Sequence, residues 1–135
     1  MEGWGNVLNK KGEGDTNVTK LGTFFIFDLF MRVIAIRTLK TFWKTFPDAE
    51  GPLRSWQQEA SKANWKNPAQ LKIHFRNASI LTNKRVVFNI KGNSYRLITD
   101  VEYRLQIIFI VWIGTHKKYN QIDAKTIGYD KTNKK

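Results

Sequence analysis

The chain of 135 residues has the length of a single domain, and its 41% hydrophobic and 25% charged residues are sufficient for a folded core. It contains no cysteine, which excludes disulfides, a thiol nucleophile and cysteine-based metal sites. With only two histidines, His74 and His116, a histidine-based zinc site would need carboxylates that the sequence barely supplies. The 23 lysines and arginines against 11 acidic residues give a net charge of +12, which predicts a polyanionic partner. The lack of cysteine is typical of a reducing cytoplasm.

The first 30 residues differ in composition from the rest of the chain. They carry a net charge of −1, so the other 105 residues carry +13. Residues 1–20 show neither a helical nor a strand period, which predicts a disordered leader. The apolar run at 21–30 contains Asp28, is half as long as the roughly 20 residues of a membrane helix, and is not followed by a signal-peptide cleavage site. We therefore expect no membrane segment, and we expect an unstructured extension at 1–30, a folded domain at 31–128 and a basic, disordered tail at 129–135.

A strand and two helices are predicted at the start of the folded domain. The alternating, branched residues at 31–37 are typical of a strand. Thr38 is a candidate N-cap for a short helix that continues to residue 46. A second helix is expected at 49–63, because proline is tolerated in a first turn and the apolar residues share one face. Residues 64–83 are expected to form a loop with short apolar anchors.

The last third of the domain is predicted to be a meander of three strands at 84–90, 95–101 and 105–113. The turn between the first two strands contains Gly92 and Asn93, which tolerate positive φ. This turn predicts a register that pairs Ile90 with Tyr95, Phe88 with Leu97 and Asn89 with Arg96. The third strand is apolar on both faces, which is typical of a central strand, and a short helical turn is expected after it.

The predicted register divides the sheet into two faces. The face toward the helices carries Val86, Phe88, Ile90, Tyr95, Leu97 and Val101. The opposite face carries Val87, Asn89, Lys91, Ser94, Arg96, Ile98 and Asp100. The predicted fold class is therefore α+β, with a small antiparallel-rich sheet packed by two N-terminal helices in the order β-α-α-β-β-β-α.

Basic and hydrogen-bonding side chains are expected to gather at one end of this sheet. Arg96 and Asn89 lie on the polar face, Lys91 lies at the hairpin end, and the segment from His116 to Tyr119 follows the last strand. Metal-free RNA cleavage requires such a set: a base for the ribose 2′-OH, cations for the charged phosphorane and an acid for the leaving 5′-oxygen. Paired carboxylates are absent from this surface, which argues against glycosidase-like or two-metal chemistry.

The candidate arginine and the histidines also have structural interpretations. Arg96 could simply pair with Asp100 or Asn89 across the sheet surface. An exposed histidine such as His116 is more often an ordinary surface residue than a catalyst. His74 is expected to be a loop residue without a role.

The remaining candidates have similar alternatives. Lys117 and Lys118 could face solvent or grip a phosphate without catalysis. Tyr119 could do no more than cover the sheet edge. Tryptophans can stack on bases, but their positions in the predicted elements favour packing in the core, and this applies to Trp43, Trp56, Trp65 and Trp112.

Four blocks of this sequence resemble the HigB toxins of bacterial toxin–antitoxin pairs, small mRNA-cleaving proteins with the RelE-like fold. The blocks are MRVIAIRTLKTFWKTFPDAEGPLRSW, ANWKNPAQLK, RVVFNIKGNSYRL and IGTHKKYNQIDAKTI, and they follow the family's order and spacing over residues 31–127. The resemblance implies a cytoplasmic, metal- and cofactor-independent endoribonuclease that cuts mRNA during translation on the ribosome. It also implies inhibition by a HigA-type antitoxin, whose helix-turn-helix would be the chain's link to operator DNA.

The resemblance also implies roles for individual residues. Arg96 in the YRL string is the candidate for contact with the phosphate and the transition state. His116 matches the family's histidine and is the candidate acid or base, with Tyr119 positioning the substrate. These three are therefore the expected catalytic residues, and the expected RNA-binding residues are Lys91, Asn93, Lys117 and Lys118. No metal ligand is expected.

Two features depart from the family pattern. Family members usually have an arginine five residues before the histidine, in a string like YIRFIGTH, whereas this chain has FIVWIGTH with Val111 at that place. The missing charge leaves open an alternative: a catalytically weakened homologue that binds RNA or the antitoxin without cleaving. Residues 1–30 have no counterpart in the family, which suggests a start codon assigned too far upstream of Met31.

Overall fold

The structure is a computed structural model that describes residues 20–21, 24–25 and 30–129. The chain divides into two compact units, Met1–Phe30 and Met31–Lys135. In the first unit, β1 (Lys20–Leu21) pairs antiparallel with β2 (Phe24–Phe25). The predictions of disorder for the rest of the leader and for the tail after residue 129 lie outside the described residues. Within the described part of the chain, no helix is long and apolar enough to cross a membrane.

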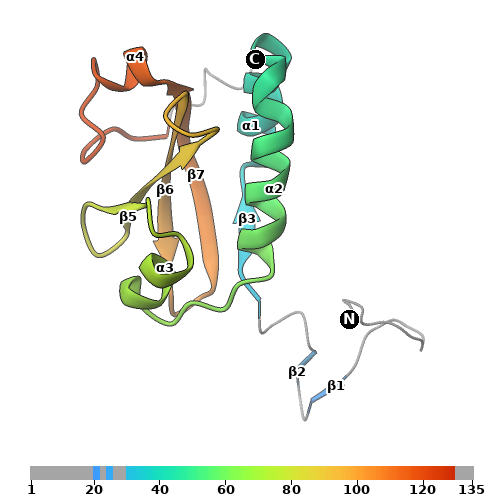
Figure 1. Cartoon of the computed structure of the whole chain (residues 1–135). Coiled ribbons are helices and arrows are strands. Elements are labelled where there is room, and N and C mark those ends of the chain that lie inside the picture. The colour runs from blue at the N-terminus through green and yellow to red at the C-terminus, as the bar shows by residue number, and fades with distance from the viewer. Residues whose placement is uncertain (1–19, 22–23, 26–29, 130–135) are drawn as a thin grey trace. The chain divides into compact units, whose positions relative to one another are not determined.

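The second unit contains the elements of the folded domain (Figure 1). In chain order they are β3 (Arg32–Ile34), α1 (Ile36–Thr45), the 3-10 helix η2 (Pro47–Ala49), α2 (Glu50–Ser61), α3 (Pro68–His74), β4 (Ser79–Ile80), β5 (Arg85–Ile90), β6 (Tyr95–Glu102), β7 (Ile107–Thr115) and α4 (His116–Tyr119). The α+β class is confirmed. The predicted order is wrong because it omits α3 and β4, which lie in the region expected to be a loop. Asn67 begins α3 by accepting a hydrogen bond from the Gln70 amide at 2.9 Å, with Pro68 in the first turn.

Five strands form one mixed sheet in the order β3-β7-β6-β5-β4. β3 runs parallel to β7, and the other three neighbouring pairs are antiparallel. The predicted hairpin register is confirmed, with Asn89 opposite Arg96. Positive φ angles fall on Lys91 (53°) and Gly92 (62°), while Asn93 keeps a negative φ. Because Lys91 already has a positive φ, its side chain does not follow the alternation of β5 between the two faces of the sheet.

The chain turns sharply between β3 and α1. β3 ends at Ile34, earlier than predicted, because Ala35 takes a left-handed conformation with φ 74° and ψ 40° at the start of α1. Thr38 is not the N-cap that the sequence predicts; it lies in the first turn, where its amide donates to the Ala35 carbonyl at 3.0 Å. Since β3 is short, it pairs with β7 only as far as Phe109.

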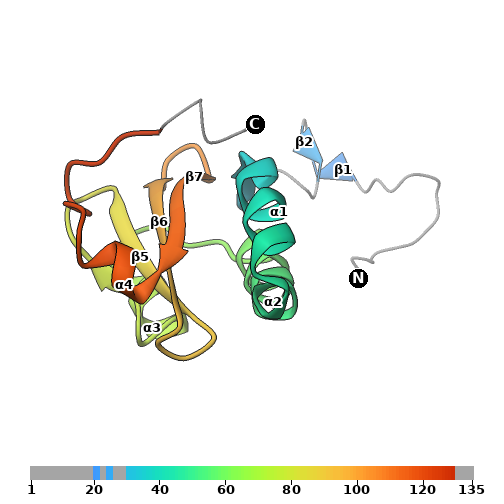
Figure 2. The ribbon, with the colours of Figure 1, turned by 90° about the horizontal axis from the view of Figure 1, so that it is seen from above.

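Helices α1 and α2 cover one face of the sheet, here called the helix-covered face (Figure 2). Leu39 and Trp43 of α1 and Leu53 and Trp56 of α2 are buried in the main core. The predicted inward-facing strand residues are confirmed in that core: Val86, Phe88, Ile90, Tyr95, Leu97 and Val101. Three tryptophans predicted to pack are also buried there: Trp43, Trp56 and Trp65. Burial of this apolar surface is the main source of the domain's stability.

The opposite face of the sheet, here called the outer face, has a second and smaller core built on Val87, Ile98 and Val111. The C-terminal segment 120–129 packs on it, and Figure 2 shows α4 and this segment on the side away from α1 and α2. Arg85 fixes the segment in place, since its Nη1 donates to the carbonyls of Ala124 (2.9 Å) and Ile127 (2.7 Å).

The same arginine side chain forms the ion pair with Asp100. Arg85 Nε donates to Asp100 Oδ1 at 2.7 Å and Nη2 donates to Oδ2 at 3.2 Å. The Asp100 carboxylate is therefore already occupied by Arg85. The sequence-based interpretation that Arg96 pairs with Asp100 is wrong.

A β-bulge changes the direction of side chains along β7. Trp112 lies opposite Ile98 and Ile110 opposite Thr99, so Val111 is the extra residue. Both Val111 and Trp112 consequently lie on the outer face, and Val111 is 3% exposed. The sequence-based prediction that Trp112 packs in the main core is wrong, because Trp112 lies half-buried on the outer face.

Candidate active site

Arg96 stands on the outer face of β6, opposite Gly114 of β7. Its guanidinium donates to the Asn93 carbonyl at 3.3 Å and to Asn93 Oδ1 at 3.4 Å. Its Cζ lies 5.6 Å from the centre of the Tyr119 ring, a cation–π contact. Within the described part of the chain Arg96 forms no ion pair, so its charge is available to an anion.

His116 is the first residue of α4, directly after β7. Thr115 caps the helix by accepting from the Lys118 amide at 3.1 Å, and the His116 amide donates to the Ser94 carbonyl at 3.0 Å. The second bond ties the start of α4 to the hairpin turn beside Arg96. The imidazole is exposed, and its Nδ1 lies 3.4 Å from the side-chain nitrogen Nδ2 of Asn120.

Tyr119 and Trp112 extend this site along the outer face. Their ring centres are 6.4 Å apart, and the Tyr119 ring also contacts Arg96. We call these three residues the Arg96–Tyr119–Trp112 platform. A Cβ at Gly114 would lie only 2.4 Å from the Trp112 indole, so the indole rests on the glycine. The sequence reasoning missed Trp112 because the bulge that turns it outward leaves no mark in a run that is apolar on both faces.

Lys91 lies apart from the platform, since it reaches toward the helix-covered side. Its Nζ is 2.7 Å from Asp48 Oδ2, and the Tyr95 hydroxyl donates to the other oxygen of Asp48. These hydrogen bonds lower the pKa of the Asp48 carboxyl below 3.8, and the Asp48 carboxylate raises the pKa of Tyr95 above 10.0. The expected RNA-binding residues are thus divided: Asn93 contacts Arg96, Lys117 and Lys118 are exposed on α4, and Lys91 is in an ion pair.

His74 is the last residue of α3, so the prediction that it lies in a loop is wrong. Its Nδ1 accepts a hydrogen bond from Trp65 Nε1 at 3.1 Å, its Nε2 faces Glu59 at 3.4 Å, and its ring stacks on Phe75. Within the described residues, no three histidine, aspartate or glutamate side chains are placed to hold a metal ion.

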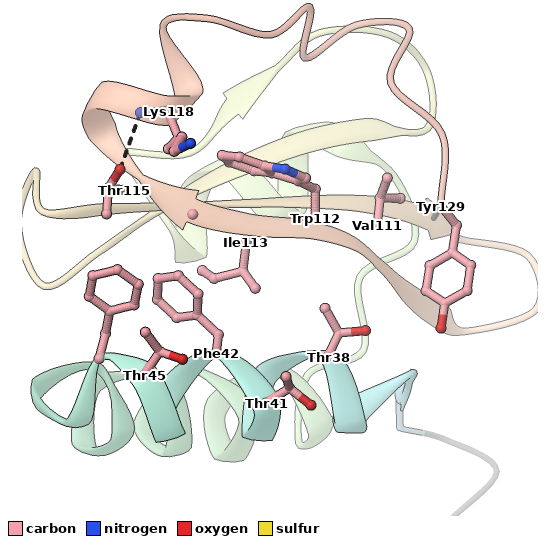
Figure 3. Close-up of a pocket in the computed structure, with 12 residues that line it drawn as sticks. Thr38, Thr41, Phe42, Thr45, Val111, Trp112, Ile113, Thr115, Lys118 and Tyr129 are labelled. Atoms are coloured by element: carbon pink, nitrogen blue, oxygen red, sulfur yellow. Dashed lines mark hydrogen bonds between the residues drawn. The ribbon is translucent and has the colours of Figure 1, made fainter. Parts of the chain in front are cut away.

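A cavity of about 380 Å³ adjoins the platform, between α1 and β7 (Figure 3). α1 residues form one wall, and β7 forms the other, with Ile113 on the side toward α1 and Val111 and Trp112 on the side away from it. Lys118 of α4 stands at the same end as Thr115. We call it the α1–β7 pocket, and its lining residues are Thr38, Thr41, Phe42, Thr45, Phe46, Val111, Trp112, Ile113, Gly114, Thr115, Lys118 and Tyr129.

A mixed five-stranded sheet with two helices on one face and cationic and aromatic side chains after its long central strand is compatible with the RelE-like fold. Comparison with known proteins defines the class further. Residues 49–122 match the model of the HigB toxin family, described as the RelE-like toxic component of a toxin–antitoxin system. The match covers more than half of the chain and includes the whole platform. The chain therefore belongs to the HigB toxin family.

Individual relatives agree with this assignment. The mRNA interferase toxin HigB of Escherichia coli K12 is 28% identical over 96 residues, which cover 70% of this chain and 92% of that protein. The mRNA interferases HigB of Escherichia coli O157:H7 and Shigella flexneri show the same identity and coverage.

Proposed function

We propose that this chain is the toxin of a type II toxin–antitoxin system and acts as a metal-independent endoribonuclease that cleaves mRNA. One observation carries the proposal: the Arg96 guanidinium, which forms no ion pair within residues 30–129, lies on one surface with the Tyr119 ring and the α4 helix that begins with His116. Membership of the HigB family and the names of the interferase relatives support it.

The proposed reaction uses the ribose of the substrate as its nucleophile. The 2′-oxygen attacks the adjacent phosphorus, and its proton passes to a base. The bond from phosphorus to the 5′-oxygen breaks, and that oxygen receives a proton from an acid. The products carry a 2′,3′-cyclic phosphate and a 5′-hydroxyl. Acid–base assistance in such a step contributes roughly 10²–10⁴-fold in rate.

Each residue has a role that its position supports. His116, exposed at the start of α4, is the proposed acid or base. Arg96 stabilises the charge on the phosphorane, because no carboxylate competes for it within residues 30–129. Tyr119 positions the substrate through its ring beside Arg96, and contacts to the RNA backbone come from Asn93, Lys117, Lys118 and the more distant Lys91.

The proposed partners follow from the family. The chain cuts mRNA on the ribosome in the cytoplasm, needs no cofactor, and is held inactive by a HigA-type antitoxin. Operator DNA is reached only through the helix-turn-helix of that antitoxin. The net charge of +12 suits both the RNA substrate and an acidic binding partner.

A second candidate function is that of a catalytically weakened homologue that binds RNA or antitoxin without cleavage. Val111 favours it, because the side chain that replaces the family's arginine packs with Val87 and Ile98 and brings no charge to the site.

The test is induced expression of the full chain in a host without the antitoxin, with mapping of mRNA 5′ ends. We expect growth arrest and new ends within translated regions, and we expect both to disappear in His116→Ala and Arg96→Ala variants. A reporter mRNA with a mutated start codon should escape cleavage if the ribosome is required. Normal growth and no new ends from soluble, folded protein would favour the weakened homologue.

A further inference from the structure

Among the described strands, the second half of β7 has a partner on one side only, and this leaves room for the α1–β7 pocket. β6 pairs with β7 up to Thr115, whereas β3 stops opposite Phe109. Residues 111–115 therefore line an open space beside α1, where the described part of the chain places no further strand. Figure 3 shows Phe42 and Thr38 of α1 directed toward β7.

The register of β7 places main-chain polar groups in the pocket wall. The bond from the His116 amide to the Ser94 carbonyl makes residues 94 and 116 a hydrogen-bonded pair. Because bonded and non-bonded pairs alternate in an antiparallel ladder, the pair of Leu97 and Ile113 is non-bonded. The N–H and C=O groups of Ile113 thus point away from β6, toward the pocket, as one donor and one acceptor.

The opposite wall supplies hydroxyl groups and an aromatic surface. Thr38, Thr41 and Thr45 lie on one face of α1 and line the pocket, with Phe42 between them. A threonine hydroxyl can donate or accept a hydrogen bond. Polar groups of both kinds next to aromatic rings match the requirements of a planar, hydrogen-bonding ligand.

The pocket is continuous with the proposed active site. Trp112 belongs to both the platform and the pocket, and Thr115 and Lys118 connect the pocket to α4. The Lys118 ammonium at this end suits a phosphate that enters with the ligand. A volume of about 380 Å³ lies within the range of small-ligand sites, roughly 300–1,000 Å³.

We propose that the α1–β7 pocket binds one nucleobase of the single-stranded RNA substrate, next to the phosphate held by Arg96 and His116. This inference rests on the proposed function and adds a base-reading subsite to it. The base stacks on the Phe42 ring, and its edge meets the threonine hydroxyls and the Ile113 main chain. Trp112, on the other side of β7, joins the pocket to the platform. Cleavage should therefore depend on base identity at one position beside the cut.

The experiment uses the full chain with His116→Ala, so that RNA is bound without being cleaved. Its ligands are fluorescein-labelled single-stranded RNA heptamers in which one abasic residue is moved along the sequence, and the dissociation constants are measured by anisotropy. We expect one abasic position to weaken binding about tenfold, as befits the loss of one stacked base. In the His116→Ala, Thr41→Trp protein, whose pocket is filled, that sensitivity should vanish.

A smaller change covers the case in which Thr41→Trp does not fold. Thr41→Val keeps the shape of the side chain but removes its hydroxyl, and we expect a loss of about threefold to tenfold in affinity for the intact RNA. Thr126→Val is the matched control, because Thr126 is exposed and lies outside the pocket, and we expect unchanged affinity.

Three results would overturn the inference in distinguishable ways. If the affinity depends on the abasic position in the same way with and without Thr41→Trp, the pocket does not bind a nucleobase, although the protein binds RNA. The same result combined with loss of antitoxin binding in Thr41→Trp would assign the pocket to an extended protein segment. No binding of any heptamer by the folded protein, free or in ribosome complexes, would contradict the proposed function itself.

Discussion

The two faces of the five-stranded sheet are built in different ways. The helix-covered face is an apolar core in which most inward-facing strand residues are buried under α1 and α2. The outer face is divided: one part is closed by the C-terminal segment around Arg85, and the other carries the Arg96–Tyr119–Trp112 platform.

This difference separates the residues that stabilise the domain from those proposed to act on RNA. The fully buried side chains on the helix-covered face, such as Phe88 and Leu97, are held by many neighbours and cannot reach a substrate. On the outer face a few specific contacts, such as the Arg85 hydrogen bonds and the indole resting on Gly114, keep polar and aromatic groups in place without covering them. Substitutions on the two faces should therefore affect different measurements.

The largest expected effect lies on the helix-covered face. Phe88 is 1% exposed and packs edge-on against Trp56 and Phe75. Phe88→Ala leaves a cavity, and we expect a loss of about 3–5 kcal/mol in the free energy of unfolding, measured by urea denaturation. His116→Ala should leave that free energy unchanged. Equal losses of unfolding free energy in Phe88→Ala and His116→Ala would contradict the view that the two faces have different roles.

Arg85→Ala tests how the outer face is closed. The change leaves Asp100 without its partner and frees the carbonyls of Ala124 and Ile127, and we expect a loss of about 2–4 kcal/mol in unfolding free energy. Amide exchange should rise first in segment 120–129. Lys84→Ala is the neighbouring control, since Lys84 pairs with Glu102 in an exposed position, and its loss should affect the unfolding free energy much less than the loss of Arg85. Unchanged exchange in the segment would refute the role of Arg85.

Gly114→Ala should damage the platform more than the fold. The new methyl group would lie 2.4 Å from the Trp112 indole, which must move. We expect the free energy of unfolding to fall by about 1–3 kcal/mol. We also expect the protein that remains folded to bind RNA more weakly than the wild type. Gly51→Ala is the matched control, because a Cβ there meets nothing within 4 Å. Normal RNA binding by Gly114→Ala would show that the indole position is not needed.

Asp48→Asn is expected to have the smallest effect, and one that depends on pH. Hydrogen bonds from Lys91 and Tyr95 lower the pKa of Asp48 in the folded state below 3.8, so its carboxylate stabilises the fold above that pH. The stabilisation is lost as the pH falls through the lowered pKa. Thermal unfolding should show a lower melting temperature for Asp48→Asn than for the wild type at pH 7. At a pH below the lowered pKa of Asp48, the two melting temperatures should be equal. A difference that persists there would contradict the assignment.

The sequence predicts the hairpin well because two independent signals agree. The apolar alternation of both strands and the turn residues around Gly92 require the same register, so Arg96 could be placed opposite Asn89. The fold class follows from the same pattern. The start of α3 carried a signal that was missed, the pair Asn67-Pro68.

Other features could not be predicted because they depend on contacts between distant residues. Lys91 meets Asp48 across 43 positions, and Arg85 meets the Ile127 carbonyl across 42. The bulge at Val111 lies within a run of apolar residues, where a shift of one position leaves the pattern unchanged. The α1–β7 pocket depends on the early end of β3, which a left-handed Ala35 causes.

The most direct test of the central claim is the rate at which the purified full chain cleaves a reporter mRNA in a reconstituted translation mixture. We predict that His116→Ala lowers this rate by about 10²–10⁴-fold with an unchanged melting temperature, and that the wild-type products carry 2′,3′-cyclic phosphate ends. Equal rates for the two proteins, or no cleavage by folded wild-type chain, would contradict the account.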